Sequence, residues 1–143
     1  MANIVPFAFK GELASGTHNF ATSGNTFKIA LYTANPYTTS STTKVTTNEV
    51  SSAGGSNYTA GGNTLTGQSV TATTATTAID FADTSWASAT FTAAFAAIYN
   101  TSSSDKLVVV LDFGGNKTAT NGTFTISFPD PSTPSNAIIS ITS

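Results

Sequence analysis

The sequence predicts an all-β fold, either a single antiparallel β-sandwich or a partly open barrel, with one long loop excursion rich in Thr, Ser and Gly. Three observations predict it. Short apolar runs alternate with polar residues at a period of two, as in half-buried strands. Gly, Asn and Pro separate these runs. Threonine, whose branched side chain suits a pleated surface, outnumbers the charged residues, which make up only 8% of the chain.

The chain is expected to form one β domain that spans residues 1–143. Its hydrophobic content of 39% and its ten Phe residues can fill a single core. Residues 1–9 are apolar and precede the first clear strand, so we interpret them as an N-terminal contact arm. Just beyond, Phe9 and Leu13 fit either a short helical turn or an edge strand.

The first strand is expected at residues 27–33. Phe27, Ile29 and Leu31 share one face there, because they alternate with residues 28, 30 and 32. Further along, residues 67–74 and 75–81 are expected to form a second pair of strands.

Residues 37–63 are the long excursion. They are dominated by Thr, Ser and Gly, and a short strand around residues 45–50 is the only element expected within them. Structureless segments of this length are uncommon in compact domains and are often functional. We therefore expect an excursion with a role in contacts.

Residues 86–99 fit two patterns. Phe91, Phe95 and Ile98 have helical spacing, whereas Phe91, Phe95 and Tyr99 share one face at a period of two. The neighbouring strands favour a strand here as well.

Three runs complete the sheet. Residues 107–113 form a continuous apolar run, which is typical of a central strand covered on both faces. Residues 123–128 alternate cleanly, and the Asn121-Gly122 pair between the two runs predicts that they form a hairpin with each other. Residues 136–142 are expected to form the last strand.

Composition and charge exclude several classes of function. The net charge of −2 and five scattered lysines, with no arginine, do not form the basic stripe of a nucleic-acid binder. No stretch has the length of a membrane span or the order of a signal peptide, so we expect synthesis in a cytoplasm and no membrane partner. The absence of Cys fits a protein that does not depend on disulfides.

His18 is the only histidine and the first candidate for acid–base chemistry. A catalytic histidine needs an orienting carboxylate and a nearby nucleophile. Glu12 lies six positions upstream, but the chain has no G-x-S-x-G motif around a serine. The favoured interpretation is a histidine that closes a loop, with its ring nitrogens hydrogen-bonded to the backbone.

Asp80, Asp83 and Asp112 are the carboxylates that come nearest to a metal site. They lie near expected strand ends, where they could bind Ca²⁺ or act as the acid and base of a glycosidase. Aspartates in such positions more often accept hydrogen bonds from local backbone amides. We therefore predict no metal, no cofactor and no catalytic residues.

A series of short motifs, in a fixed order, carries a resemblance to a known family. The motifs are KGEL at residues 10–13, GTHNF at 16–20, FKIALYT at 27–33, TNEV at 47–50, YTAGG at 58–62, VVVLDFGG at 108–115 and NGTFTI at 121–126. In this order, from about residue 7 to residue 141, the chain resembles small virion structural proteins of tailed bacteriophages.

The resemblance implies a β-rich, non-enzymatic subunit, with capsid decoration, also called cement, as the favoured role. Such a protein would be made in the host bacterial cytoplasm and bind the major capsid protein on the capsid exterior, as a dimer or trimer. The candidates for capsid contact are Ile4, Val5, Phe7 and Phe9.

Two alternatives to capsid decoration stay open. One is a structural protein of the tail, neck or fibre base. The other is a carbohydrate-binding β-sandwich in which aromatic residues near Trp86 form a sugar-stacking platform, although buried core anchors are the favoured interpretation of these aromatic residues. An enzyme is the least favoured class, because the chain has one histidine and few charged groups.

Overall fold

The computed structural model describes residues 2–130 and 137–142, and it confirms the all-β class. One antiparallel sheet has the order β2-β1-β5-β6, and a second has the order β3-β4-β7. The strands are β1 (Phe27–Tyr32), β2 (Asn63–Thr64), β3 (Ser69–Ala72), β4 (Thr76–Asp80), β5 (Thr84–Asn100), β6 (Lys106–Ile126) and β7 (Ile139–Thr142). A helix, α1 (Phe7–Ala14), precedes them, and a 3₁₀ turn, η1 (Thr101–Ser103), joins β5 to β6.

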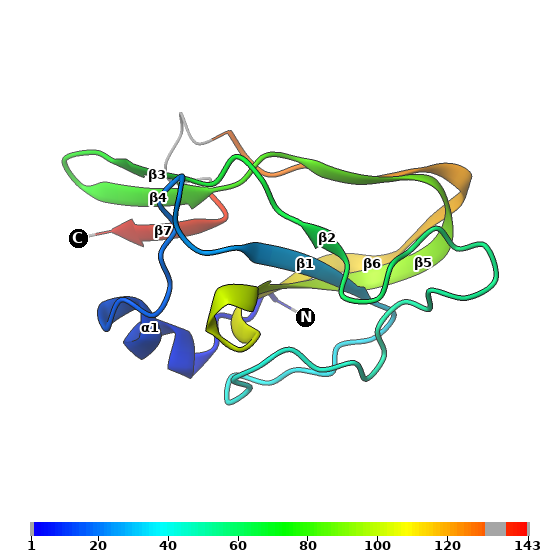
Figure 1. The fold of residues 1–143 in the computed structure, drawn as a ribbon, viewed down its shortest axis with the longest axis horizontal. Helices are drawn as coiled ribbons and strands as arrows, with labels where there is room; N and C mark the ends of the chain where they lie inside the picture. The colour runs from blue at the N-terminus through cyan, green and yellow to red at the C-terminus, as the bar shows by residue number, and fades with distance from the viewer. Residues whose placement is uncertain (1, 131–136, 143) are drawn as a thin grey trace.

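The two sheets share the larger apolar core. Figure 1 shows β3, β4 and β7 grouped at one end of the molecule. The core includes Phe27 and Ile29 of β1 together with Ile79 of β4 and Ile139 of β7. Because both sheets contribute buried apolar side chains to it, the arrangement is sandwich-like.

The first sheet is also covered on its other face. Ala30 and Tyr32 of β1 belong to a second buried cluster, together with Tyr37 from the excursion. Ile4 packs against the same cluster. The alternation predicted for β1 is therefore confirmed, and both of its faces are buried.

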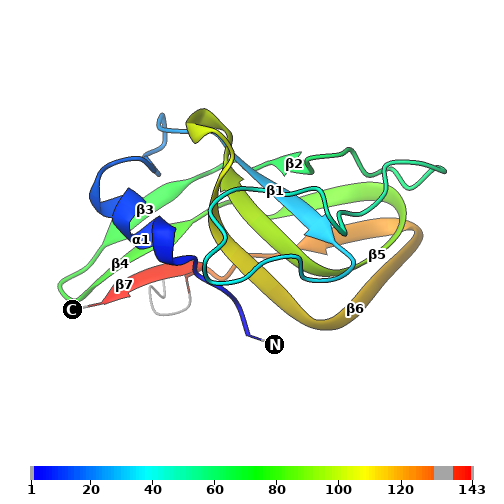
Figure 2. The ribbon, with the colours of Figure 1, turned by 90° about the horizontal axis from the view of Figure 1, so that it is seen from below.

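The hairpin predicted between residues 107–113 and 123–128 is wrong. Both runs belong to the single strand β6, which pairs along its length with β5, as the long curved ribbon in Figure 2 shows. Gly114 and Gly115 adopt positive φ and form an irregularity within this strand, not a turn between two strands. The chain reverses instead at η1, where Ser104 and Asp105 have left-handed backbone conformations.

β6 is an edge strand of its sheet, not the central strand that its apolar run predicts. Leu107 and Val110 are nevertheless buried, because other segments lie along the edge. Ile4 and Val110 exchange two backbone hydrogen bonds of 2.9 and 2.8 Å, and Thr43 forms a bridge with Lys106. Irregular segments thus shield the part of the edge nearest to η1.

The strand predicted for residues 86–99 is confirmed as part of β5, but a bulge divides its faces. The pairing register with β6 shifts between Ala93 and Phe95. Phe91 therefore faces the larger core, whereas Phe95 and Tyr99 face the second cluster. The shared face predicted for all three is wrong, because the side chains after the irregularity between Ala93 and Phe95 point to the opposite face from those before it.

The excursion contains no strand within residues 37–62, so the short strand predicted at residues 45–50 is wrong. Within residues 45–50, Glu49 forms an isolated bridge with Tyr32. The excursion returns to the sheet at Gly62, which has a φ of 73°. A Cβ at Gly62 would overlap the carbonyl of Ile29, so this close approach requires glycine.

The remaining elements agree with the sequence. β3 and β4 pair antiparallel, as predicted, and Ile79 and Phe81 face the core together. β7 begins at Ile139, and position 136, where the last strand was expected to start, lies outside the described residues. Around Phe9 and Leu13, the structure forms the helical alternative as α1.

Candidate functional site

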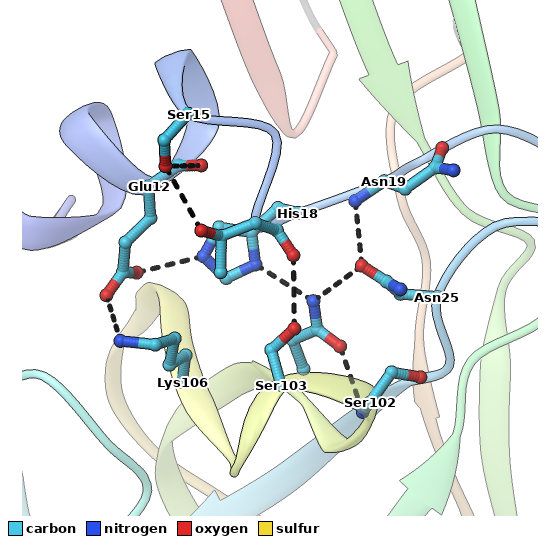
Figure 3. A network of polar contacts seen from close by, with 10 residues as sticks. Glu12, Ser15, His18, Asn19, Asn25, Ser102, Ser103 and Lys106 are labelled. Carbon is cyan, nitrogen blue, oxygen red and sulfur yellow. Dashed lines mark hydrogen bonds and ion pairs between the residues drawn. The ribbon is translucent and has the colours of Figure 1, made fainter.

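His18 lies at the centre of a buried polar network between α1 and the end of the β5–β6 pair (Figure 3). Its side chain has no exposed surface. Nε2 lies 3.0 Å from Glu12 Oε2, and Nδ1 lies 3.0 Å from Asn100 Nδ2. Lys106 donates to the second oxygen of Glu12 at 2.6 Å. The ring nitrogens therefore contact side chains, and the predicted backbone hydrogen bonds are wrong.

The hydrogen bonds of Asn100 identify the tautomer of His18. The backbone N–H of Ser102 donates to Asn100 Oδ1 at 3.0 Å, which places the amide nitrogen toward His18. The same nitrogen donates to Asn25 Oδ1 at 3.0 Å. His18 Nδ1 must then accept, and the ring proton sits on Nε2 and is donated to Glu12.

This arrangement leaves neither ring nitrogen available to a hydroxyl group. Ser15, the closest serine in sequence, bonds instead to the Glu12 carbonyl and to the Thr17 hydroxyl. A general base needs a free lone pair within reach of the proton that it abstracts. The geometry of His18 is that of a structural joint, in which one imidazole connects a helix to a strand end.

Glu12 carries the charge of this network. Burial by itself raises the pKa of its carboxyl, but hydrogen bonds from Lys106 and His18 outweigh burial, and the pKa is lowered. The carboxylate is thus ionised at neutral pH and paired with Lys106, whose side chain is 35% exposed.

A second buried network, centred on Glu49, holds the excursion. Glu49 accepts hydrogen bonds from Lys44 Nζ at 2.6 Å, from the Tyr58 hydroxyl at 2.9 Å and from the backbone N–H of Gly61. Its side chain is 6% exposed. Glu49 was not among the residues predicted from the sequence. The only available signal was the presence of opposite charges five positions apart in a chain with few charges.

Tyrosines extend this second network. The Tyr37 hydroxyl donates to the Tyr32 hydroxyl at 2.7 Å, and Tyr32 donates to the Val45 carbonyl at 2.8 Å. The Tyr99 hydroxyl donates to the Gly61 carbonyl at 2.7 Å. The long excursion is therefore fixed by buried side chains, although it lacks strands of its own.

The three candidate aspartates do not form a metal site. Asp80 and Asp83 lie near each other at the end of β4, but Asp112 lies in β6 opposite Phe95. No group of three or more His, Cys, Asp or Glu side chains within residues 2–130 and 137–142 could hold a metal ion.

Each of these aspartates has a backbone partner. Asp112 accepts from the N–H of Gly114 at 2.8 Å, as in the predicted local turn, and this bond lowers its pKa. Asp83 accepts from the distant N–H of Phe128. Burial raises the pKa of Asp80, the N–H of Phe81 opposes that rise, and the negative charge of Asp83 adds to it.

The four candidate contact residues divide into two pairs. Phe9 is 3% exposed and belongs to the core, and Ile4 is half-buried in its bridge to β6. Val5 and Phe7 are 41% and 65% exposed. Only Val5 and Phe7 therefore offer apolar side chains to a partner.

The aromatic residues around Trp86 are interior. Trp86 stacks on Tyr58 with ring centroids 6.2 Å apart and contacts Phe124 at 6.0 Å, and its side chain is buried. These rings are core anchors and present no sugar-stacking face. A hollow of about 670 Å³ along β6 is lined by Phe113 and Phe128, but Asp112 is the one acidic residue among the described residues that line it, and these residues provide no pair of carboxylates as in a glycosidase.

Comparison of the chain with family models, curated proteins and solved structures found no match. Within the part of the chain that the structure describes, no helix combines the length and apolar character needed to cross a membrane.

Proposed function

We propose that the chain is a virion structural protein of a tailed bacteriophage, and that it acts as a capsid decoration (cement) protein. It binds the major capsid protein on the exterior of the capsid and stabilises the lattice, together with one or two further copies of itself. The motif order supports this role, as does an all-β scaffold whose single histidine is enclosed in a structural joint.

The observation that carries the proposal is an anchored segment with exposed apolar side chains. Ile4 is paired with Val110, and the N–H of Phe7 donates to the Thr39 carbonyl at 2.9 Å. Val5 and Phe7 are thus held on a fixed backbone while their side chains face solvent. A partner that covers them gains apolar burial without the entropic cost of ordering this segment.

Attachment of this kind works by mass action. Contacts that exist only on the assembled lattice stabilise the lattice, because the free subunit gains nothing from them. Repetition of a small contact on a symmetric shell, through a dimer or trimer, multiplies its strength by effective concentration.

The test is co-sedimentation of the purified protein with capsids that lack it. The double variant Val5→Ser, Phe7→Ser is expected to weaken attachment by about tenfold or more, since two apolar contacts are lost. The matched control is Val70→Ser with Ile141→Ser, which removes side chains of similar exposure, 50% and 47%, from the other sheet. Equal attachment by the two double variants would contradict the proposal.

The copy number of the protein locates it within the virion. A decoration protein is expected in numbers comparable to the major capsid protein, and band intensities from purified particles measure this ratio. A ratio of only a few copies per particle would place the protein in the tail, neck or fibre base instead.

A further inference from the structure

The helix α1 has little stability of its own. It has eight residues, below the length of about 12–15 at which isolated helices become even marginally stable, and it contains Gly11. Its N-cap, Pro6, makes no side-chain hydrogen bond, and neither end carries a charge that complements the helix dipole. The position of α1 therefore depends on its tertiary contacts.

Those contacts are few among the described residues. Phe9 enters the core beside the His18 ring, at a centroid distance of 5.2 Å, and Glu12 joins the His18 network. Leu13 packs against the edge of the core and also lines a hollow of about 460 Å³ together with Val70 and Ile141. The His18 joint is thus a main attachment of α1 to the sheets.

A second proton on the His18 ring can bind only at Nδ1. Nε2 already carries a proton that it donates to Glu12, so the added proton must bind Nδ1. Nδ1–H would then face Asn100 Nδ2, 3.0 Å away, and two donors would oppose each other.

Asn100 cannot accommodate the new donor without loss. Rotation of its amide would turn the nitrogen toward the backbone N–H of Ser102 and would remove the donor from Asn25 Oδ1. Asn100 is fully buried and Asn25 is half-buried, so the broken bond between them carries a desolvation cost, whereas Ser102 is exposed.

The charged groups around His18 provide limited compensation. Within the described network these are Glu12 of α1 and Lys106 of β6, while β5 contributes the neutral Asn100. Glu12 attracts a charged imidazole, but Lys106 already neutralises much of that carboxylate. The other neighbours of the ring are the apolar rings of Phe9, Phe20 and Phe27, which do not solvate a charge.

We propose that His18 is a proton-sensitive latch. It holds α1 against the end of the β5–β6 pair while the imidazole is neutral, and it releases α1 when Nδ1 is protonated. Since α1 begins at Phe7, release removes the helical support on one side of the exposed Phe7 side chain, while the bridge between Ile4 and Val110 still holds the backbone before Val5. This last consequence rests on the proposed function, whereas the latch itself does not.

The experiment follows the ring and the helix separately in the free protein. His18 is the only histidine, so its ring gives a single set of NMR signals that report its protonation directly as the pH is lowered. Amide hydrogen exchange, expressed as protection factors to correct for the intrinsic effect of pH, reports the opening of α1 and of β1. We expect protection in α1 to fall about tenfold or more as the ring titrates, while protection in β1 is retained.

The variant Asn100→Asp tests the donor–donor conflict. A carboxylate at this position accepts the Nδ1 proton, so protonation of His18 should no longer release α1, and the loss of protection should disappear or reverse. The latch is wrong if α1 in the wild-type protein keeps its protection through the titration of the ring. It is equally wrong if α1 and β1 lose protection together, because that result means global unfolding.

These measurements use no capsid. A failure of Val5 and Phe7 to support attachment would leave the latch intact, and a failure of the latch would leave the attachment result unchanged. The two hypotheses are therefore tested independently.

Discussion

The N-terminal segment, residues 2–20, and the excursion, residues 37–62, are attached to the same sheet in different ways. Both lie against the β2-β1-β5-β6 sheet with isolated bridges to it, and each is held by a partly buried carboxylate. Glu49 is enclosed with Lys44, whose side chain is only 11% exposed. Glu12 is paired with Lys106, which is 35% exposed, and with a titratable imidazole.

The difference shows how much the surroundings decide what a carboxylate does. The partners of Glu49 are a largely enclosed ammonium group, a tyrosine and a backbone amide, so its network is largely closed to solvent and holds the excursion rigidly. The network of Glu12 reaches water at Lys106 and includes a group that can change charge. We infer that the excursion is a permanent part of the fold, whereas α1 is adjustable.

The largest expected effect comes from breaking the closed network. Glu49→Ala leaves Lys44 buried without a counter-ion and removes the acceptor for Tyr58, so we expect a loss of about 3–5 kcal/mol in the free energy of unfolding, measured by denaturant titration. The matched control is Lys44→Met with Glu49→Gln, which leaves no unpaired charge and should recover most of the loss. A loss below about 1 kcal/mol for Glu49→Ala is the value typical of a surface ion pair, and it would contradict the claim that the Glu49 network is the more enclosed of the two.

Breaking the open network should cost less. Glu12→Ala removes the partner of His18 Nε2, but water can still solvate Lys106, so we expect a loss of about 1–3 kcal/mol in the free energy of unfolding. Lys10→Ala, an exposed change in the same helix, is the control and should stay within about 0.5 kcal/mol of wild type.

The Glu12 effect has a defined pH dependence. The pKa of Glu12 in the folded protein is lowered from the ordinary value of 4.5. The contribution of Glu12 to the free energy of unfolding is therefore fully present above pH 4.5, and it is lost as the pH falls through the pKa of the folded protein. The difference between wild type and Glu12→Ala should shrink on acidification. A difference that grows in acid would mean that the carboxylate is not stabilised in its charged form.

Ionisation of the tyrosines is expected to have the smallest effect on stability, because at neutral pH it makes no contribution. All four are buried, and burial is the main cause that raises the pKa of Tyr32, Tyr37, Tyr58 and Tyr99 above the ordinary value of 10. Above pH 10 the folded state therefore holds more protons than the unfolded state, and stability falls as the pH rises. Tyrosinate absorbance should rise only together with the loss of near-ultraviolet circular dichroism. Titration of tyrosines in a chain that keeps its native dichroism would show that the excursion opens independently.

Much of the fold could be predicted because it depends on local patterns. The period of two in residues 27–32 identified both faces of β1, and the pair β3–β4 was predicted from the two consecutive runs at residues 67–74 and 75–81. The pairing of β6 could not be predicted in this way. Asn121-Gly122 is a strong hairpin signal, yet β5 supplies a partner for the full length of β6, so the chain continues through the glycines.

The candidate site was predicted only in part. His18 and Glu12 were noticed because they are rare residues, but Asn100, which is 82 positions away from His18, has no signal in the sequence. Glu49 was missed for the same reason, since its importance comes from burial, and burial is decided by how the excursion folds back at Gly61 and Gly62.

The sequence by itself determined that this protein is built from antiparallel strands around an aromatic core, because alternation and turn chemistry act between near neighbours. Only the tertiary structure decided which runs share a strand, where a bulge exchanges the two faces of β5, and which of the few charged groups are enclosed. The reason is physical. Pairing and burial depend on contacts between residues far apart in the chain, and each such contact depends on how everything else packs.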